Sequence, residues 1–251
     1  LVAANMVYKA AKPDGLTIGN FIGNLVSQQL FGSPGIEFDG RKFEWIGVPT
    51  RDHVVCALTK ASGITSLDAW MAAKTPVKIG GSAPGTTNDD SAKLLKAALG
   101  LPIQLVTGYK GTAPIKLAAE SGEVAGSCWA WESIKVMWRQ GLDDGQVNIV
   151  LQAVPKAVPD LPKVPVAIEL AKTDEARKLI EVGIHSTAAI TRPYALPPGT
   201  PKDRVQLLRR AFQETLKDKD FLAEAVKSKL DVDPVSGEEV EKIVAGLFKL
   251  D

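Results

Sequence analysis

Short apolar runs alternate along the chain with longer amphipathic segments. The runs predict strands at residues 16–21, 43–48, 54–59, 77–80, 104–107, 124–130, 147–153 and 184–191. Helix starts are indicated by Thr87-Asn88-Asp89-Asp90 and Thr200-Pro201-Lys202-Asp203, and Ser66 and Ser236 are expected to cap further helices. Strands that alternate with helices in this way are typical of an α/β fold with a mainly parallel sheet.

Two predicted strands are each followed by a segment of different amino-acid composition. Residues 54–59 lead into Ala61-Ser62-Gly63, and residues 147–153 lead into a stretch with prolines at 155, 159, 162 and 165. We interpret both places as crossings between lobes. Residues 59–153 are then an inserted second lobe, and residues 1–58 and 154–251 together form a discontinuous first lobe.

Composition narrows the class of protein. The 251 residues are 45% hydrophobic and 24% charged, with a formal net charge of +1, so no strong basic field indicates a nucleic-acid partner. No apolar run approaches the ~20 residues of a membrane-spanning helix, and direct membrane insertion is not expected. The two cysteines, Cys56 and Cys128, allow one disulfide, but the favoured interpretation is two buried free thiols.

Motifs for common enzyme chemistries are missing from the sequence. It has no P-loop, no dinucleotide-binding glycine motif, no nucleophile elbow and no zinc-binding H-E-x-x-H. The two histidines, His53 and His185, are expected in strands as structural residues. We therefore predict a protein that is not an enzyme, with no catalytic residues, no metal site and no cofactor.

A small-residue loop follows the predicted strand 77–80 and opens onto a helix. Small residues let a ligand approach the backbone, and the N–H groups at a helix start favour an anion. The loop can therefore hold a carboxylate without any arginine, although Asp89 and Asp90 compete for the same positive helix end. The alternative is a plain strand-to-helix turn. The candidate ligand-binding residues are Gly81, Ser82, Ala83, Gly85, Thr86 and Thr87.

A second loop, residues 108–114, also joins a strand to a helix. Ligands of open α/β sheets bind outside the carboxyl ends of the strands, so both loops are expected to face one crevice. This loop contributes Tyr109, Lys110, Gly111 and Thr112 as candidates. Trp129 is a further candidate, because Trp129 and Trp131 share a face if their strand continues and can then wall a pocket; core packing is the open alternative.

Several of these segments resemble one family, the substrate-binding proteins of tripartite tricarboxylate transporters, often called the Bug family. The resemblance covers nearly the whole chain and depends on the order and spacing of the pieces. The pieces are Ala3-Ala4-Asn5 with Pro13-Asp14-Gly15-Leu16-Thr17, Tyr109-Lys110-Gly111 with Gly122-Glu123-Val124, Leu161-Pro162-Lys163-Val164-Pro165, and Pro197-Pro198-Gly199-Thr200-Pro201.

The resemblance implies a type II periplasmic-binding-protein fold, in which two α/β lobes surround a ligand cleft. It implies a periplasmic receptor, with its signal peptide removed or absent from this chain, that delivers a small organic carboxylate to integral membrane transporter subunits. The family holds the carboxylate through backbone groups of two loops, one in each lobe, with ordered waters helping. The loop of the inserted lobe falls here on residues 81–87, and the family's Tyr-Lys-Gly block falls on Tyr109, Lys110 and Gly111. A ligand-sensing module of a regulator or signalling receptor is the alternative on the same fold.

The chain also departs from the family pattern. The glycine-rich loop lacks the family's histidine, and Ala125 stands where the family commonly has Asp, so an amino-acid ligand is less expected. The family's opening strand–helix–strand, which carries its other ligand loop, has no counterpart here. The first lobe is therefore expected to be incomplete at its N-terminus, with its apolar faces partly exposed or covered by another chain.

Overall fold

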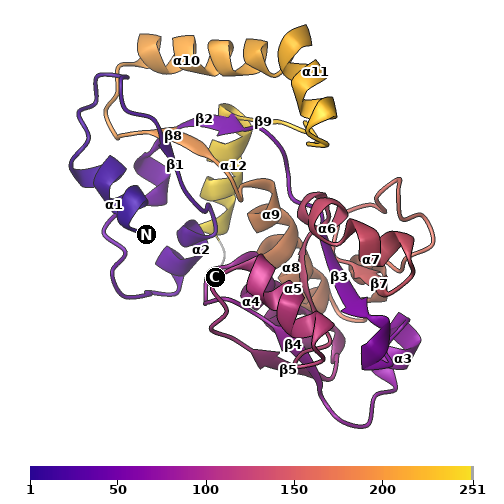
Figure 1. Cartoon of the computed structure of the whole chain (residues 1–251). Helices are drawn as coiled ribbons and strands as arrows, with labels where there is room; N and C mark the ends of the chain where they lie inside the picture. Colours follow the sequence, from indigo (N-terminus) through magenta and orange to yellow (C-terminus); the bar gives the residue numbers. More distant parts are fainter. Residues whose placement is uncertain (250–251) are drawn as a thin grey trace. The chain divides into compact units, whose positions relative to one another are not determined.

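A computed structural model describes residues 1–249 of the chain (Figure 1). The chain forms two compact units: unit 1 contains Leu1–Arg51 and the segment from Ala189 on, and unit 2 contains Asp52–Ala188. The boundaries between the units lie at residues 51–52 and 188–189, whereas the sequence analysis placed them at 58–59 and 153–154. Among residues 1–249, no helix combines the length and the apolar character that crossing a bilayer requires.

Unit 2 is built on a five-stranded sheet in the order β5-β4-β6-β3-β7. Its strands are β3 (Val54–Thr59), β4 (Val77–Gly80), β5 (Ile103–Val106), β6 (Gly126–Ala130) and β7 (Val147–Gln152). β4 runs parallel to β5 and β6, whereas β3 pairs antiparallel with both β6 and β7. Because β3 and β7 pair in this sheet, they belong to unit 2 and do not form the crossings between the units.

Hydrophobic clusters lie on both faces of this sheet. Along β3, Val54, Cys56 and Leu58 join one cluster, and Val55 and Ala57 join the other. All residues of β3 are buried, as expected for a central strand covered on both sides. The helices of unit 2 are η2 (Lys60–Ser62), α3 (Leu67–Met71), α4 (Thr87–Leu99), α5 (Thr112–Glu120), α6 (Trp131–Met137), α7 (Arg139–Asp143), η3 (Ala167–Leu170), α8 (Asp174–Ile180) and the π-helix η4 (Glu181–Ser186), with α9 (Thr187–Ala189) at the unit boundary.

Unit 1 contains a four-stranded sheet in the order β1-β8-β2-β9. The strands are β1 (Gly19–Asn20), β2 (Glu44–Val48), β8 (Tyr194–Leu196) and β9 (Val235–Ser236). α10 and α12 pack against β2, and Ser236 caps α12 as predicted. The helices are α1 (Val2–Lys9), α2 (Leu25–Leu30), η1 (Gly40–Lys42), α10 (Lys202–Thr215), α11 (Lys219–Lys227) and α12 (Gly237–Leu247).

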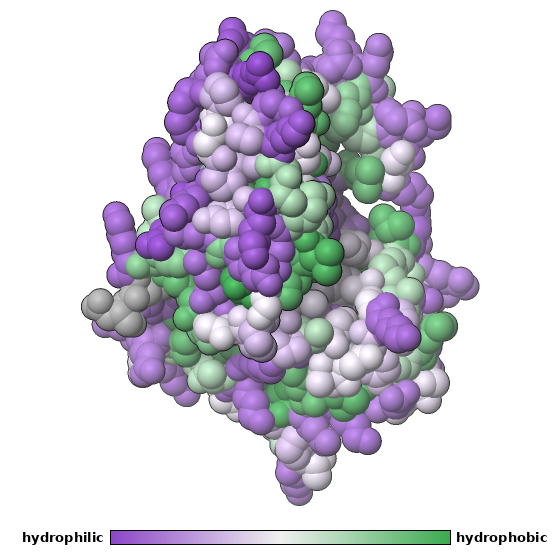
Figure 2. Space-filling model, turned by 90° about the vertical axis from the view of Figure 1, so that its left-hand side faces the viewer, coloured by the Kyte–Doolittle hydropathy of each residue, from purple (hydrophilic) through white to green (hydrophobic). Residues whose placement is uncertain are grey.

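Unit 1 exposes apolar side chains along its first segment. Figure 2, which turns the left-hand side of Figure 1 toward the viewer, shows apolar and hydrophilic residues intermixed on this face. Within the first 31 residues, eight large apolar side chains have exposed fractions between 39% and 85%: Leu1, Val2, Met6, Leu16, Ile18, Ile22, Leu30 and Phe31. The first lobe therefore carries the apolar surface that the sequence predicted.

The strand predicted at residues 184–191 is wrong, because residues 184–189 are helical. Ile180, Ile184 and Ala188 are all buried in one cluster of unit 2. A spacing of four residues places side chains on one face of a helix as well as on one face of a strand, so the sequence pattern did not distinguish the two. His185 consequently lies in η4, and the second crossing between the units moves to residues 188–189.

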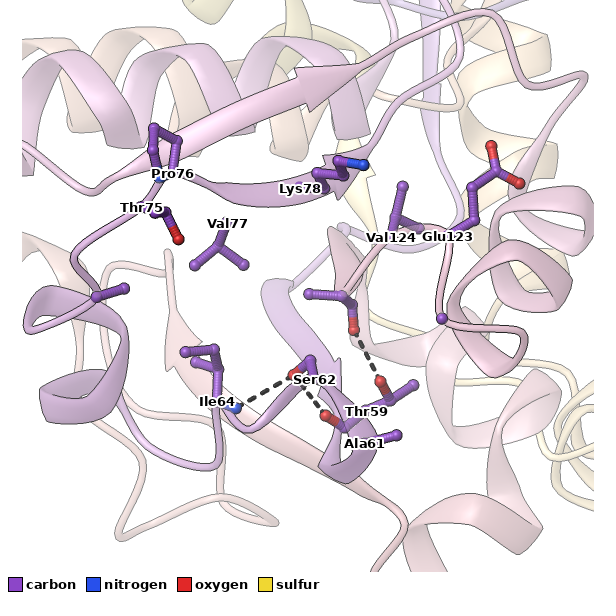
Figure 3. Close-up of a pocket in the computed structure, with 13 residues that line it drawn as sticks. Thr59, Ala61, Ser62, Ile64, Thr75, Pro76, Val77, Lys78, Glu123 and Val124 are labelled. Carbon is purple, nitrogen blue, oxygen red and sulfur yellow. Dashed lines mark hydrogen bonds between the residues drawn. The ribbon is translucent and has the colours of Figure 1, made fainter.

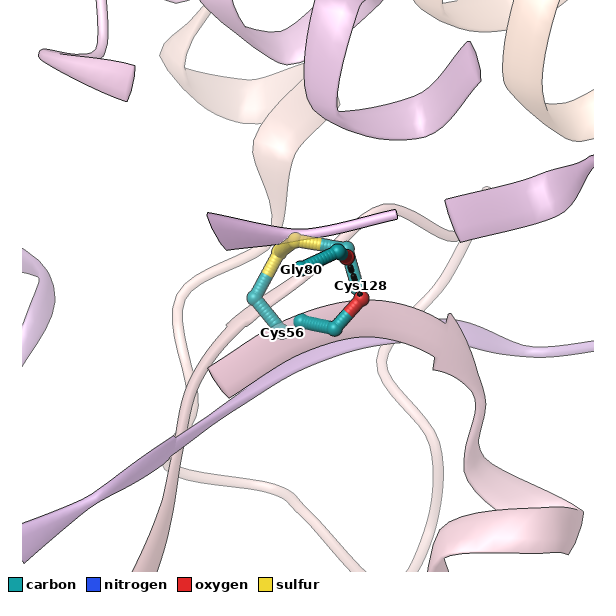
Figure 4. The surroundings of a disulfide bond; sticks show 4 residues. Cys56, Gly80 and Cys128 are labelled. Carbon is teal, nitrogen blue, oxygen red and sulfur yellow. Dashed lines mark hydrogen bonds between the residues drawn. A yellow bond between two sulfur atoms is a disulfide. The ribbon is translucent and has the colours of Figure 1, made fainter. Parts of the chain in front are cut away.

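The preference for free thiols is also wrong, since Cys56 and Cys128 form a disulfide (Figure 4). The two residues are direct partners in the antiparallel pairing of β3 with β6, with a Cα–Cα distance of 4.0 Å. Both side chains are fully buried. The two cysteines are 72 residues apart, so the sequence alone did not indicate that they pair.

Candidate ligand-binding site

Two loops leave the same edge of the unit 2 sheet. Residues 81–86 connect β4 to α4, and residues 107–111 connect β5 to α5. Because β4 and β5 are parallel neighbours, their carboxyl ends lie side by side. The structure thus brings together the two loops that the sequence singled out.

Backbone hydrogen bonds join the two loops directly. Gly81 N donates to Val106 O at 2.8 Å, Gly108 N donates to Ser82 O at 3.0 Å, and Tyr109 N donates to Gly81 O at 3.3 Å. These bonds continue the β4–β5 pairing beyond the last strand residues. The loops therefore form one connected backbone surface.

The loop before α4 is held by side chains from the first turn of that helix. The Thr86 hydroxyl lies 2.6 Å from Ala83 O and 2.7 Å from Asn88 Oδ1, and its single proton serves one of them at a time. Gly85 N donates to Asp90 Oδ1 at 3.1 Å. The N-cap is Thr86, not Thr87, and its hydroxyl makes no capping bond to the helix.

Two acidic side chains, Asp89 and Asp90, lie beside this loop and compete with an anionic ligand for its amides. Burial raises the pKa of Asp90 above its usual range, and Asp89 adds to the rise, while the Gly85 N–H and Lys93 oppose it. The amide of Gly85 has an internal carboxylate partner. Within residues 81–87, the amides of Gly81, Ala83, Gly85 and Thr86 donate to Val106 O, Thr86 Oγ1, Asp90 Oδ1 and Ala83 O, respectively.

The start of α5 is more open to an anion. Its first turn consists of Thr112, Ala113 and Pro114, none of them acidic, and no side chain among the described residues caps it at Gly111. Gly111 has a φ of +107°, and a Cβ on it would meet no described atom within 4 Å. Amides at a helix start carry partial positive charge, so this position suits a carboxylate better than the start of α4.

The side chains predicted beside these amides have internal partners. The Tyr109 hydroxyl donates to Glu123 Oε1 at 2.5 Å, and burial together with Glu123 raises the pKa of Tyr109 to about 12. The Thr112 hydroxyl lies 3.4 Å from Met137 Sδ. Lys110 is exposed, so its ammonium group can approach a ligand from solvent.

Trp129 lies in the hydrophobic core of unit 2, in a cluster against which Tyr109 also packs. Its side chain is 3% exposed and packs against Trp138 at a centroid distance of 5.3 Å. β6 ends at Ala130, and Trp131 begins α6, so the two tryptophans do not continue one strand. For Trp129 the structure supports the core-packing alternative.

A separate hollow of about 360 Å³ lies at the other end of β4, beside Val77 (Figure 3). Two of its polar groups serve the fold: Thr59 Oγ1 donates to Ala125 O, and the Ser62 hydroxyl bonds to Thr59 O and accepts from Ile64 N. Lys78 and Glu123 also line the hollow. The loop edge differs from it in having two helix starts, whose amides favour a carboxylate. Within residues 1–249, no cluster of three His, Cys, Asp or Glu side chains is arranged to hold a metal ion.

Comparisons with known proteins support the fold. No protein-family model and no curated protein sequence matches the chain. Among solved structures, the periplasmic binding protein BugD has a TM-score of 0.72 at 22% identity, covering 99% of this chain and 79% of its own. MatC of Rhodopseudomonas palustris, with bound malate, has a TM-score of 0.70 at 19% identity, covering 99% and 81%.

A third similar structure is R. palustris Rpa4515 with adipate, which has a TM-score of 0.69 at 21% identity and covers 99% of this chain and 79% of its own. One of these three neighbours is a periplasmic binding protein, and the other two hold the carboxylates malate and adipate. The chain therefore has the α/β periplasmic-binding-protein fold, as the sequence resemblance predicted.

Proposed function

We propose that the chain is a periplasmic solute receptor that binds a small organic carboxylate and delivers it to a tripartite tricarboxylate-type membrane transporter. The main support is the edge of unit 2 at which two glycine-containing loops are joined by backbone hydrogen bonds. Bound malate and adipate in proteins of the same fold support a carboxylate as the ligand.

The ligand carboxylate is proposed to bind at the start of α5. There the amides of Gly111 and Thr112 face no acidic residue of their own turn, and Lys110 adds a positive charge. The loop before α4 contributes through Ser82 and Thr87, whereas the amides of Ala83 and Gly85 stay with Thr86 and Asp90. This arrangement requires neither a buried arginine nor catalysis.

The proposed compartment is supported by the disulfide between Cys56 and Cys128. Disulfides persist in oxidising compartments such as the bacterial periplasm and are rare in the cytosol. A receptor that collects solutes there must release its ligand to membrane subunits, which are the proposed partners.

Calorimetric titration with mono-, di- and tricarboxylates, amino acids and neutral sugars tests this proposal. Gly111→Ala is the informative variant, because it adds a methyl group where the ligand is placed and strains a positive φ. Gly122→Ala is its matched control, since Gly122 also has a positive φ and open space but lies at the other end of α5. We expect a carboxylate to bind the parent and the control, and to bind Gly111→Ala about tenfold more weakly or worse. Binding of a neutral sugar with no response to any carboxylate contradicts the proposal.

A further inference from the structure

Asp89 is a fully buried carboxylate in the first turn of α4. A buried carboxylate is costly unless it is hydrogen-bonded or paired. Here Thr107 Oγ1 lies 3.2 Å from each carboxylate oxygen, and Lys93 Nζ lies 3.6 Å from Oδ2. Asp89 therefore reaches from α4 to the first residue of the loop before α5.

The same carboxylate also contacts the other loop. A Cβ on Gly81 would lie 2.1 Å from Asp89 Oδ1 and 2.8 Å from Leu105 Cδ1, so only glycine fits there without displacement. Oδ1 thus packs against the backbone of Gly81, the residue that exchanges hydrogen bonds with Val106 and Tyr109. One buried group touches both loops at the place where they are joined.

An acidic residue in a first helical turn usually needs no such contacts. It stabilises the helix through the positive N-terminus while it remains in solvent. Asp89 does more than this. It is fully buried, it bonds to the hydroxyl of Thr107 in the second loop, and it packs closely on Gly81 in the first loop. The contacts are those of a group that fixes the two loops relative to each other.

We infer that Asp89 is a positioning residue that holds residues 81–86 and 107–111 in one arrangement for ligand binding. The inference rests on the proposed function, which assigns these loops to the ligand. Asp89 itself is fully buried, so it acts through Thr107 and Gly81 and not by touching the ligand.

Amide hydrogen exchange tests the positioning role without any ligand. The variants are Asp89→Asn, Thr107→Val and Thr107→Ser, with Thr59→Val as a matched control that removes a buried threonine hydrogen bond far from the loops. In Asp89→Asn and Thr107→Val we expect exchange in residues 81–86 and 107–111 to rise about tenfold, with β7 unchanged. Thr107→Ser keeps the hydroxyl and should restore slow exchange. Loop exchange equal to the parent's in both Asp89→Asn and Thr107→Val overturns the inference.

Ligand affinity provides the second readout. With malate or adipate, whichever the parent binds, Thr107→Val should raise the Kd about tenfold, and Thr107→Ser and Thr59→Val should leave it within about twofold. An equal loss of affinity in Thr59→Val and Thr107→Val indicates a general loss of stability and contradicts positioning. If the parent binds no carboxylate, the proposed function fails, and the exchange rates still decide whether Asp89 orders the loops.

Discussion

Removal of the Cys56–Cys128 disulfide should destabilise unit 2 strongly. The bond closes a loop with a sequence separation of 72 residues, which contains β4, β5, α4 and α5. In the chain-entropy treatment, a loop of this size restricts the unfolded state by about 4 kcal/mol. Alanine is the suitable replacement, because both side chains are fully buried and a serine hydroxyl there would need a new hydrogen-bond partner.

The assay is urea unfolding of the parent and of the double variant Cys56→Ala with Cys128→Ala. Tryptophan fluorescence reports mainly on unit 2, which contains Trp70, Trp129, Trp131 and Trp138. We expect the free energy of unfolding of the double variant to be lower than that of the parent by roughly 3–4 kcal/mol. When the parent is unfolded without a reducing agent, it should show no free thiol to a thiol reagent. Two titratable thiols in the parent, or a loss below about 0.5 kcal/mol in the variant, would refute this reasoning.

Two further predictions concern the titration and packing of unit 2. Burial lowers the pKa of His185 to about 4, and Nε2 has no hydrogen-bond partner among the described residues, so the unfolded state takes up the proton first as the pH falls. Between pH 6.5 and pH 5 the parent should lose roughly 1.5 kcal/mol more stability than His185→Gln does, and parallel pH profiles for the two proteins would contradict this. Gly81→Ala should cost about 1–3 kcal/mol through its clash with Asp89 and Leu105, and a melting temperature equal to the parent's would show that the loop can shift without cost.

The sequence predicted most of the sheet of unit 2, because its strands are apolar runs bounded by clear turn residues. β3 and β4 have the predicted bounds. Residues 184–191 were misassigned because their apolar residues suit either period, and only packing on α4 selects the helix. The loop positions were likewise predictable from strand-to-helix order.

The internal partners of the site could not be predicted from the sequence. Asp89 and Thr107 are 18 residues apart and meet only once β4 and β5 pair in parallel. Cys56 and Cys128 meet only through the register of β3 with β6. The sequence allowed Trp129 to wall a pocket together with Trp131. In the structure β6 ends at Ala130, between the two residues, and Trp129 is buried. Each of these contacts depends on register between distant segments, which local patterns do not specify.

The most direct test of the central claim is an NMR titration that follows the backbone amides of the ¹⁵N-labelled protein during addition of malate or adipate. A carboxylate held at the loop edge should shift the amides of residues 81–87 and 109–112, with the largest changes at Gly111 and Thr112. The amides beside the hollow at residues 59–62 and 122–125 should stay in place. Saturable shifts confined to that hollow, or shifts produced by a neutral sugar and by no carboxylate, would contradict the account.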